Sequence, residues 1–441
     1  MKLLRPPHID KSFLTAERMI DILKEYTVYD KRYLHFDEIA RRLHDKDLRL
    51  EVWAALKMKR ASTGQIIELA GQPAMFNLTP QITKAMSLVD KFAFGHNGEP
   101  LPEDATTYLV SQLIMEEAIS SSQLEGAATT SRVARELLAV ARPPRNEDES
   151  MIMGNWRLMS HIASMGDTPL TTADILDIHL LACQNINDDK YQPGLLRDNN
   201  DVYVGGRDGE IVHTPPEFHL IAGMLDNLCE LVIRLDEDEH HPLVVACIMH
   251  FAIGYIHPFN DGNGRTARGL FYYHMIKKGY TAFRYISISK LLKAAPVKYG
   301  ISYLYTEIDD MDLTYFIAYQ CDIVLRAVRD FATQIETLHN ERRRLVMFVE
   351  NNLLLAKGEL DIMAIALNAP GSLLSAGNIK DRLGISDNTA RARLNSLKDK
   401  GLLRPVKDGK GFVYQAPSSV NKLKEWAEKA GQKMLRESDK T

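Results

Sequence analysis

Apolar residues recur at helical spacing along most of the chain. The repeat i, i+3, i+4 predicts helices at 14–26, 35–44, 80–93, 107–125, 129–141, 150–164, 171–184, 217–235, 241–255, 263–278, 287–294, 312–338 and 341–356. Strands do not alternate with these helices, which argues against a doubly wound α/β sheet. The pattern therefore predicts an all-α core, preceded by a helical N-terminal region at 1–100.

Two short β-branched and aromatic runs interrupt the helices, at 201–204 and 211–213. Between them lies a turn-forming stretch rich in glycine that includes the pair Asp208-Gly209. Pro215 and Pro216 follow the second run, and proline cannot extend a strand ladder. We therefore expect a small β-hairpin at 201–214.

The pattern changes again after about residue 357. A short helix at 378–383, a turn at 384–386, a second helix at 387–400 and two strand-like runs at 402–406 and 412–414 follow one another. This order is typical of a winged helix-turn-helix. The predicted domains are thus a central domain at 101–340, a connecting helix at 341–360, a winged helix-turn-helix at 361–420 and a helical tail at 421–441.

Composition narrows the class of protein. With 441 residues, 45% of them apolar and 25% charged, the chain is long enough for several globular domains. A net charge of −4 gives no overall attraction to nucleic acid or to a membrane. Proline interrupts the N-terminus where a signal peptide needs an apolar run, and no apolar stretch suffices for a membrane span. The cysteines lack CxxC spacing, so we expect free thiols and a cytoplasmic location: Cys183, Cys229, Cys247 and Cys321.

The segment HPFNDGNGRTAR at 257–268 has the residue types of an anion site. Gly262 and Gly264 stand just before an amphipathic helix, where backbone N–H groups and the helix dipole favour a negative charge. Arg265 and Arg268 are three residues apart, so we expect both to project toward the same anion. The segment predicts binding of a phosphorylated ligand.

The same segment also carries candidate chemistry. His257 has a side chain suited to accept a proton near neutral pH. Asp261 adds one carboxylate, too few for a metal cage of protein ligands alone but suited to Mg²⁺ that phosphates already hold. Neither a Walker A loop nor GxGxxG is present. An anion cradle, arginines, a metal ligand and a base together indicate phosphoryl-type transfer.

With these residues in view, the segment resembles the Fic family signature HPFx(D/E)GNGRxxR, and it matches that signature without a departure. The resemblance covers roughly 107–335 and implies an all-α Fic core with a β-hairpin flap. It also implies a protein adenylyltransferase that moves AMP from ATP to a Ser, Thr or Tyr hydroxyl of a target protein or of itself. The roles it implies are a base for His257, Mg²⁺ or Mn²⁺ binding for Asp261, and phosphate binding for Gly262, Asn263, Gly264, Arg265 (β-phosphate) and Arg268 (γ-phosphate).

The hairpin at 201–214 stands where the family has its flap. The edge of such a flap can hold an extended target segment by strand addition. We therefore expect the target protein to dock on Val202, Tyr203, Val204 and Gly205.

The helix predicted at 107–126 ends in SSQLEG at 121–126. Ser121 and Glu125 are four residues apart on one face, and the macrodipole at this helix end disfavours a carboxylate without an external cation. The sequence resembles the family's inhibitory motif (S/T)xxxE(G/N), which implies that Glu125 pairs with Arg268 and restrains the enzyme. In some relatives this glutamate also orients a water that removes AMP, so a bifunctional or mainly AMP-removing enzyme is an alternative.

The C-terminal helix-turn-helix leaves two interpretations open. Asn388, Arg391 and Arg393 are residue types that read bases and phosphates, which would make the chain a DNA-binding regulator. Winged helices also dock proteins, and homodimerisation stays open. We expect the buried face of this helix to contain Ala390, Ala392, Leu394 and Leu397.

Overall fold

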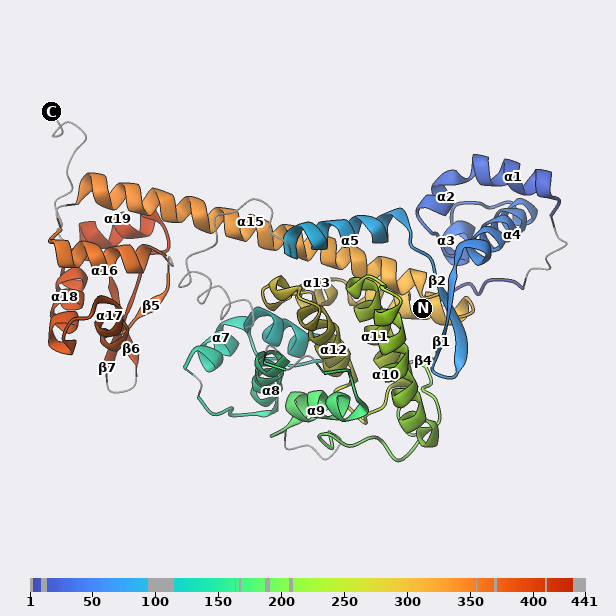
Figure 1. Cartoon of the computed structure of the whole chain (residues 1–441), viewed down its shortest axis with the longest axis horizontal. Coiled ribbons are helices and arrows are strands. Elements are labelled where there is room, and N and C mark those ends of the chain that lie inside the picture. Colours follow the sequence, from blue (N-terminus) through green and yellow to red (C-terminus); the bar gives the residue numbers. More distant parts are fainter. Residues whose placement is uncertain are drawn as a thin grey trace. The chain divides into compact units, whose positions relative to one another are not determined.

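The computed structural model describes residues 3–8, 14–93, 115–140, 142–162, 164–165, 168–186, 191–205, 209–353, 355–368, 371–408 and 411–430. Helices dominate, with a few small hairpins, as the periodicity predicts (Figure 1). The chain divides into two compact units, Met1–His96 with Leu113–Val328, and Asn97–Gln112 with Arg329–Thr441. None of the helices within the described ranges is both long and apolar enough to span a membrane.

The core of the first unit is built around α11 (Pro242–Ile256) and α12 (Asn263–Lys277), which lie side by side (Figure 1). α11 is apolar on all sides and almost wholly buried, as expected of a central helix. His241 caps its first turn by accepting a hydrogen bond from the amide of Leu243, and Pro242 occupies the first helical position. The packed neighbours are α8 (Glu147–Ile162), α9 (Thr172–Cys183) and α10 (Ile221–Glu237).

The described part of this unit contains further helices around that core. On the N-terminal side they are α1 (Ala16–Glu25), α2 (Thr27–Lys31), α3 (Phe36–Ala40), α4 (Lys46–Thr63) and α5 (Pro80–Ala93). A helical stretch at 115–124, α7 (Ser131–Val140), α13 (Ser289–Ala294) and α14 (Pro296–Ile308) complete the set, with single 3₁₀ turns at Phe218–Leu220 and Thr281–Arg284. Of the inhibitory helix predicted at 107–126, the part before 115 lies outside the described residues.

The N-terminal region contains a hairpin that the helical reading missed. β1 (Gln65–Leu69) and β2 (Gln72–Phe76) pair antiparallel around a turn in which Gly71 has φ +74°. Met75 in β2 also bonds the segment that precedes α15, through Met311 O (3.1 Å) and the amide of Leu313 (2.8 Å). The β-branched pair Ile66-Ile67, shortly before Gly71, is the strand signal that the helical repeat does not include.

A buried arginine joins the N-terminal helices to the core of the same unit. Arg60 is 2% exposed, and its guanidinium lies 3.9 Å from the ring centroid of Tyr33 and 3.0 Å from the hydroxyl of Tyr315. Lys57 adds an ion pair with Asp309 (2.8 Å). Residues before 97 therefore pack as part of the unit that contains α11 and α12.

The two helices predicted at 312–338 and 341–356 are one helix. α15 runs without a break from Thr314 to Asn352. The prediction of a boundary near 340 was wrong because a local gap in the apolar repeat does not end a helix, and neither Gly nor Pro occurs in this range.

The second unit contains the elements expected at the C-terminus, with small shifts. α17 (Ala376–Leu383), a turn and α18 (Asp387–Asp399) precede β6 (Arg404–Asp408) and β7 (Gly411–Gln415), and the sheet order is β5-β7-β6 with β5 at Leu373–Leu374. Ser386 caps α18 by accepting a hydrogen bond from the amide of Thr389. α16 (Lys357–Asn368) and α19 (Val420–Lys429) pack in the same unit, and 431–441 lie outside the described residues.

The buried face of α18 differs from the prediction at one position. Ala390, Leu394 and Leu397 are buried, but Ala392 is exposed. The helical period explains the difference, because a residue two positions after Ala390 points about 200° away from it.

Buried histidines predict an acid-sensitive first unit. Burial lowers the pKa of His35 to about 3 and the pKa values of His179 and His274 to about 4. An unfolded histidine titrates near pH 6.5, so below that pH the unfolded chain binds protons that the folded chain does not. Stability should therefore fall as pH drops from about 6.5 toward 4, by about 2 kcal/mol for each such histidine at pH 5.

Thermal unfolding midpoints at pH 7 and pH 5 measure this effect. His274→Gln should reduce the difference between the two pH values, while His161→Gln, at an exposed position, should leave it unchanged. Equal midpoints at both pH values for the unsubstituted protein would contradict the prediction.

Candidate active site

A tight loop at 257–262 joins α11 to α12 and shapes the candidate site. α11 ends with His257 in the left-handed region (φ 50°, ψ 58°), and Gly262 precedes α12 with φ +85°. A Cβ atom on Gly262 would lie 2.5 Å from the Sγ atom of Cys183 in α9. Both the backbone angle and the close packing thus require glycine at 262.

The side chain of Asn263 closes this loop. Its Nδ2 donates to Phe259 O (2.8 Å), and its Oδ1 accepts from the amide of Phe259 (3.0 Å). In this structure one N–H of Nδ2 and the Oδ1 of Asn263 bond Phe259, so the side chain holds the loop closed. Phosphate binding by Asn263 stays a prediction, and the backbone N–H groups at the start of α12 are further candidate donors to an anion.

Two residues that the sequence did not single out hold the loop from outside. Arg197 is buried, donates through Nε to His257 O (2.9 Å) and bonds Pro258 O with its own amide (3.0 Å). His179 accepts from the amide of Gly194 at Nδ1 (3.0 Å), so its Nε2 carries the proton and donates to Asp261 O (2.9 Å). No local pattern marks either residue, because their partners are distant in the sequence.

His257 is half-buried and lies at the mouth of the loop. Its Nδ1 lies 3.3 Å from Gly254 O. A carbonyl oxygen only accepts, so Nδ1 carries the proton and Nε2 is left as a lone-pair acceptor in the neutral ring. Burial lowers the pKa of His257 to about 4, against a smaller opposing effect of the Gly254 hydrogen bond. The ring is therefore neutral, and able to accept a proton, at neutral pH.

Arg268 and Glu125 meet, although 143 positions separate them. Arg268 Nη2 lies 2.8 Å from Glu125 Oε1, and Arg268 Nε donates to Ser121 Oγ (2.9 Å). Burial lowers the pKa of Arg268, but the charge and hydrogen bond of Glu125, with the nearby Tyr299 and Glu117, together outweigh this effect, so the net shift of the pKa is upward. Arg268 is 1% exposed, and its Nη1 has no hydrogen-bond partner within the described part of the chain.

The carboxylate of Glu125 also covers the first turn of α12. A Cβ atom on Gly264 would lie 2.2 Å from Glu125 Oε1 and 3.1 Å from Arg268 Nη1. The carboxylate thus lies against the backbone of Gly264, where an anion bound at this helix N-terminus would lie.

Glu117 was not predicted, but it anchors the helical stretch that carries Ser121 and Glu125. It is buried and accepts from Ser287 Oγ (2.7 Å), from the amide of Ser289 (3.1 Å) and from Ser289 Oγ. The spacing of four residues places Glu117, Ser121 and Glu125 on one helix face. This anchor fixes the position from which Glu125 reaches Arg268.

Arg265 is placed differently from Arg268. It is fully buried, donates to Ala182 O in α9 (2.7 Å) and lies 5.2 Å from the ring centroid of Tyr191. Its Nε and Nη2 have no hydrogen-bond partner among the described residues. Arg265 thus bonds α9 and Arg268 bonds the stretch at 115–124, and the binding of one anion by both arginines stays a prediction.

Asp261 is half-buried at the loop, and its Oδ1 accepts from the amide of Gly262 (2.6 Å). Within the described ranges, no group of three or more His, Cys, Asp or Glu side chains could hold a metal ion. A metal at this loop would thus depend on ligand oxygens for most of its coordination, as Mg²⁺ often does with phosphates.

The predicted flap is shorter than the sequence suggested. β3 (Val204–Gly205) pairs with β4 (Ile211–His213) across a bulge, whereas 201–203 are not in a strand and 206–208 lie outside the described residues. Among the expected docking positions, Tyr203 is 58% exposed and Val202 is half-buried. The amide of Asp201 bonds Asn199 Oδ1 (3.0 Å), which is a turn contact and not part of a ladder.

The flap is anchored near the loop by His213. Its Nε2 donates to Tyr255 O (2.8 Å), and its Nδ1 lies 2.8 Å from Glu307 Oε2. Burial lowers the pKa of His213, but the hydrogen bond and charge of Glu307 outweigh it, so the net shift is upward. Tyr255 is two residues before His257, so this anchor links β4 to the end of α11.

Residues 169–275 match the family model described as Fic/DOC family. Two curated relatives are each called "Protein adenylyltransferase Fic". The one from Drosophila yakuba is 36% identical over 115 residues, 25% of this chain and 21% of that protein. The one from Drosophila willistoni is 32% identical over 111 residues, 25% of this chain and 20% of that protein. The chain spans about a fifth of the length of these relatives.

Solved structures show the same fold at low sequence identity. A Fic family protein from Desulfovibrio desulfuricans is 17% identical with a TM-score of 0.50, over 77% of this chain and 97% of that one. Fic-1 from C. elegans is 16% identical with a TM-score of 0.52, over 72% and 85%. Residues 169–275, which contain the loop at 257–262, are thus similar to the Fic/DOC family, and the solved structures show a Fic-type fold.

Proposed function

We propose that this protein transfers AMP from ATP to a hydroxyl group of a target protein and is restrained by its own Glu125. The observation that carries the proposal is the pair at the start of α12: a buried Arg268 whose Nη1 has no hydrogen-bond partner among the described residues, and a carboxylate that covers Gly264. A buried guanidinium with an unused donor beside a helix N-terminus is suited to a phosphate, and Glu125 now lies there.

The transfer step follows from the state of His257. Its neutral Nε2 would take the proton from a Ser, Thr or Tyr hydroxyl, whose oxygen attacks the α-phosphorus of ATP. A bond forms between that oxygen and phosphorus, the bond from phosphorus to the β-phosphate oxygen breaks, and pyrophosphate leaves. The target segment would lie along β3, which brings its hydroxyl to the side of α11 that ends in His257.

ATP would be held by groups at the start of α12. The backbone N–H groups of 263–265 and the Nη1 of Arg268 are the proposed donors to the phosphates. Asp261 would share Mg²⁺ or Mn²⁺ with the phosphates, and the metal would supply charge neutralisation as the pyrophosphate leaves. Arg265 is the proposed donor to the β-phosphate, because its Nη1 bonds Ala182 O while its Nε and Nη2 have no hydrogen-bond partner among the described residues.

The position of the labelled phosphate in ATP distinguishes transfer of AMP from transfer of the γ-phosphate. Glu125→Gly protein, incubated with a cell lysate and ATP labelled at the α-phosphate, should put label on protein, and ATP labelled at the γ-phosphate should not. Label transferred from the γ-position would show a kinase-type reaction and overturn the proposal, as would no transfer from either position. The double variant with His257→Ala serves as the control for bound nucleotide.

AMP removal is the second candidate, and the exposure of Glu125 favours it. The side chain of Glu125 is 26% exposed while its Oε1 bonds Arg268, so solvent reaches a carboxylate at the proposed phosphate site. A water oriented there could attack an AMP–protein bond. A target labelled by the Glu125→Gly variant, repurified and mixed with unsubstituted protein, would lose its label under this alternative.

The C-terminal unit does not lead us to a third proposal. Asn388 and Arg391 are exposed on α18, but Arg391 pairs with Asp387 (2.6 Å). Arg393 is half-buried against α16, where its Cζ lies 2.3 Å from the position of a Cβ on Gly358. Of the predicted DNA contacts, Arg393 thus has a packing role within its unit. DNA or protein binding through a winged helix stays a prediction.

A further inference from the structure

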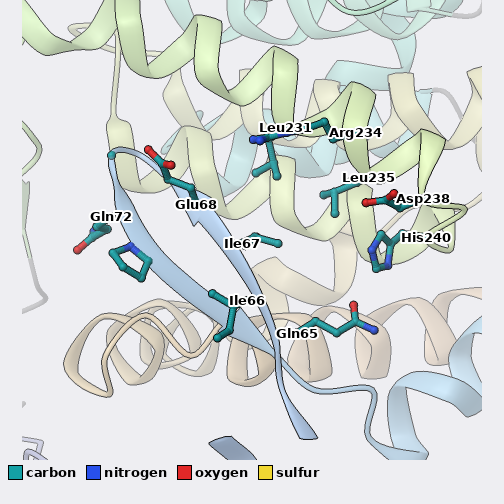
Figure 2. Close-up of a pocket in the computed structure, with 12 residues that line it drawn as sticks. Gln65, Ile66, Ile67, Glu68, Gln72, Leu231, Arg234, Leu235, Asp238 and His240 are labelled. Carbon is teal, nitrogen blue, oxygen red and sulfur yellow. The ribbon is translucent and has the colours of Figure 1, made fainter. Parts of the chain in front are cut away.

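A cavity of about 730 Å³ lies between the β1–β2 hairpin and the C-terminal half of α10, in the first unit (Figure 2). Its apolar part comes from Ile67 on the hairpin and from Leu231 and Leu235 on the helix. Figure 2 shows Ile67 between the hairpin ribbon and these leucines. Ile66, also in the lining, is 78% exposed. An exposed isoleucine at the edge of a cavity with apolar and polar lining is suited to contact an apolar side chain of a bound segment.

The outer edge of β1 borders this cavity and has free backbone groups. Met75 uses its N–H and C=O to bond Met311 and Leu313, so both groups point away from β1. Its partner Ile66 is therefore in a non-hydrogen-bonded pair, and the N–H and C=O of Ile66 point outward. Glu68 lies two residues after Ile66 on β1, so it is also in a non-hydrogen-bonded pair and its N–H and C=O also point outward. Its partner Pro73 has no N–H to donate.

The outward N–H and C=O groups of Ile66 and Glu68 are open to hydrogen bonding as far as the described residues show. Within the described ranges, no backbone hydrogen bond joins Ile66 or Glu68 to another element. Two such residues, spaced by two along a strand, form the acceptor and donor pattern to which an extended peptide adds as a further strand.

The charges around the cavity indicate the chemistry of that peptide. Glu68, Asp238 and one cation, Arg234, line it, and α10 with the turn after it has six carboxylates against this one arginine between 226 and 239. The C-terminal end of α10 adds the negative end of its dipole. Asp236 is partly neutralised by Lys278 (2.8 Å), but Glu237, Asp238 and Glu239 are exposed. A segment with Lys or Arg is therefore the complementary partner.

We propose that the outer edge of β1, with the cavity beside it, docks an extended, basic segment of a partner protein. The segment adds a strand antiparallel or parallel to β1, places one apolar side chain against Ile67 and Leu235, and sets its basic side chains toward Glu68 and Asp238. The hairpin is in contact with the candidate active site, because Gln72 Nε2 donates to the hydroxyl of Tyr255 (2.7 Å). This docking does not depend on AMP transfer.

The test uses the full chain and a fluorescent peptide of alternating valine and lysine, about eight residues long, as a strand of ordinary length requires. We expect it to bind at least about tenfold more tightly than the matching valine–glutamate peptide, and the difference should shrink with salt. Hydrogen exchange should show slower exchange of the amides of Ile66 and Glu68 when the valine–lysine peptide is present.

One substitution isolates the strand edge. Ile66→Pro removes an outward N–H and no bond to β2, so the hairpin should keep its stability while peptide affinity falls about tenfold. Ile66→Val, which keeps that N–H, is the matched control. Glu68→Lys with Asp238→Lys should reverse the preference between the two peptides.

Each result decides the proposal. Equal binding of the two peptides, or none, would overturn it. Undiminished binding to Ile66→Pro, or no protection of the Ile66 and Glu68 amides in the unsubstituted protein, would show that β1 is not the docking edge. The exchange measurement needs no substitution, so it holds even if Ile66→Pro lowers the melting temperature.

Discussion

Replacement of Glu125 by glycine should raise the rate of AMP transfer by about 10²-fold, the effect of losing one buried charged hydrogen bond of 2–3 kcal/mol at the phosphate site. Glu125 Oε1 now bonds Arg268 Nη2 and lies against Gly264, so its charge competes with a phosphate for the same donors. Without it, both nitrogens of the Arg268 guanidinium that face the site are available to ATP. Transfer from α-labelled ATP, compared at equal protein concentration, measures the change.

Two companion variants separate charge from bulk. Glu125→Gln keeps the size and removes the charge, so it should raise the rate of AMP transfer less than Glu125→Gly does. Glu125→Asp keeps the charge but reaches Arg268 less well, so its rate should lie between those of the unsubstituted protein and Glu125→Gly. In the absence of nucleotide, Glu125→Gly leaves Arg268 buried without its counter-ion, so the melting temperature should fall. ATP should restore it, and by a larger shift than in the unsubstituted protein.

Equal rates of AMP transfer by Glu125→Gly and by the unsubstituted protein would show that the ion pair between Glu125 and Arg268 does not restrain the site. A fall in melting temperature without any greater effect of ATP would give the pair a purely structural role.

Loss of His257 should abolish transfer in the released enzyme. His257→Ala in the Glu125→Gly background should lower the rate by about 10²–10⁴-fold, the range for removal of a general base. Because the side chain bonds only Gly254 O among described residues, the substitution should leave ATP binding and the melting temperature nearly unchanged. Nucleotide affinity, measured by the shift in melting temperature with ATP, therefore serves as the internal control.

The pH dependence gives a second measure of the same residue. His257 acts as a base in its neutral form, and burial lowers its pKa to about 4. Transfer should therefore rise with pH through about 4 and show no inflection near 6.5, where an ordinary histidine titrates. A clear inflection at 6.5 that disappears in His257→Asn would show that the ring is more solvated than its surroundings indicate.

Much of this site could be predicted from local sequence. The order of residues at 257–268 indicates an anion loop at a helix N-terminus, and the structure places that loop between α11 and α12. The helical repeat also located most helices, because burial of one face imposes a period that is visible in the chain itself. The repeat did not predict the hairpin at 65–76, because strands of five residues are too short to show a clear period. It also failed near 340, where the apolar repeat is interrupted inside one long helix.

What local sequence could not supply are partners distant along the chain. Arg197 and His179 hold the loop, and Glu117 anchors the stretch that carries Glu125, yet none of them belongs to a pattern. Arg265 and Arg268 are three residues apart in one helix, and the sequence placed them on one anion. The sequence did not show that Nη1 of the fully buried Arg265 bonds the carbonyl of Ala182 in α9, which only packing brings near.

The sequence by itself thus determined the chemistry available: a histidine base, a glycine-flanked helix start, an arginine and a carboxylate that resembles an inhibitor. Tertiary structure alone decided which of these groups meet. It placed Glu125 on Arg268 across 143 positions, closed Asn263 on its own loop, and left the edge of β1 open beside an apolar cavity. The reason is physical: residue types and short spacings are local properties, whereas hydrogen-bond partners and burial depend on how distant segments pack.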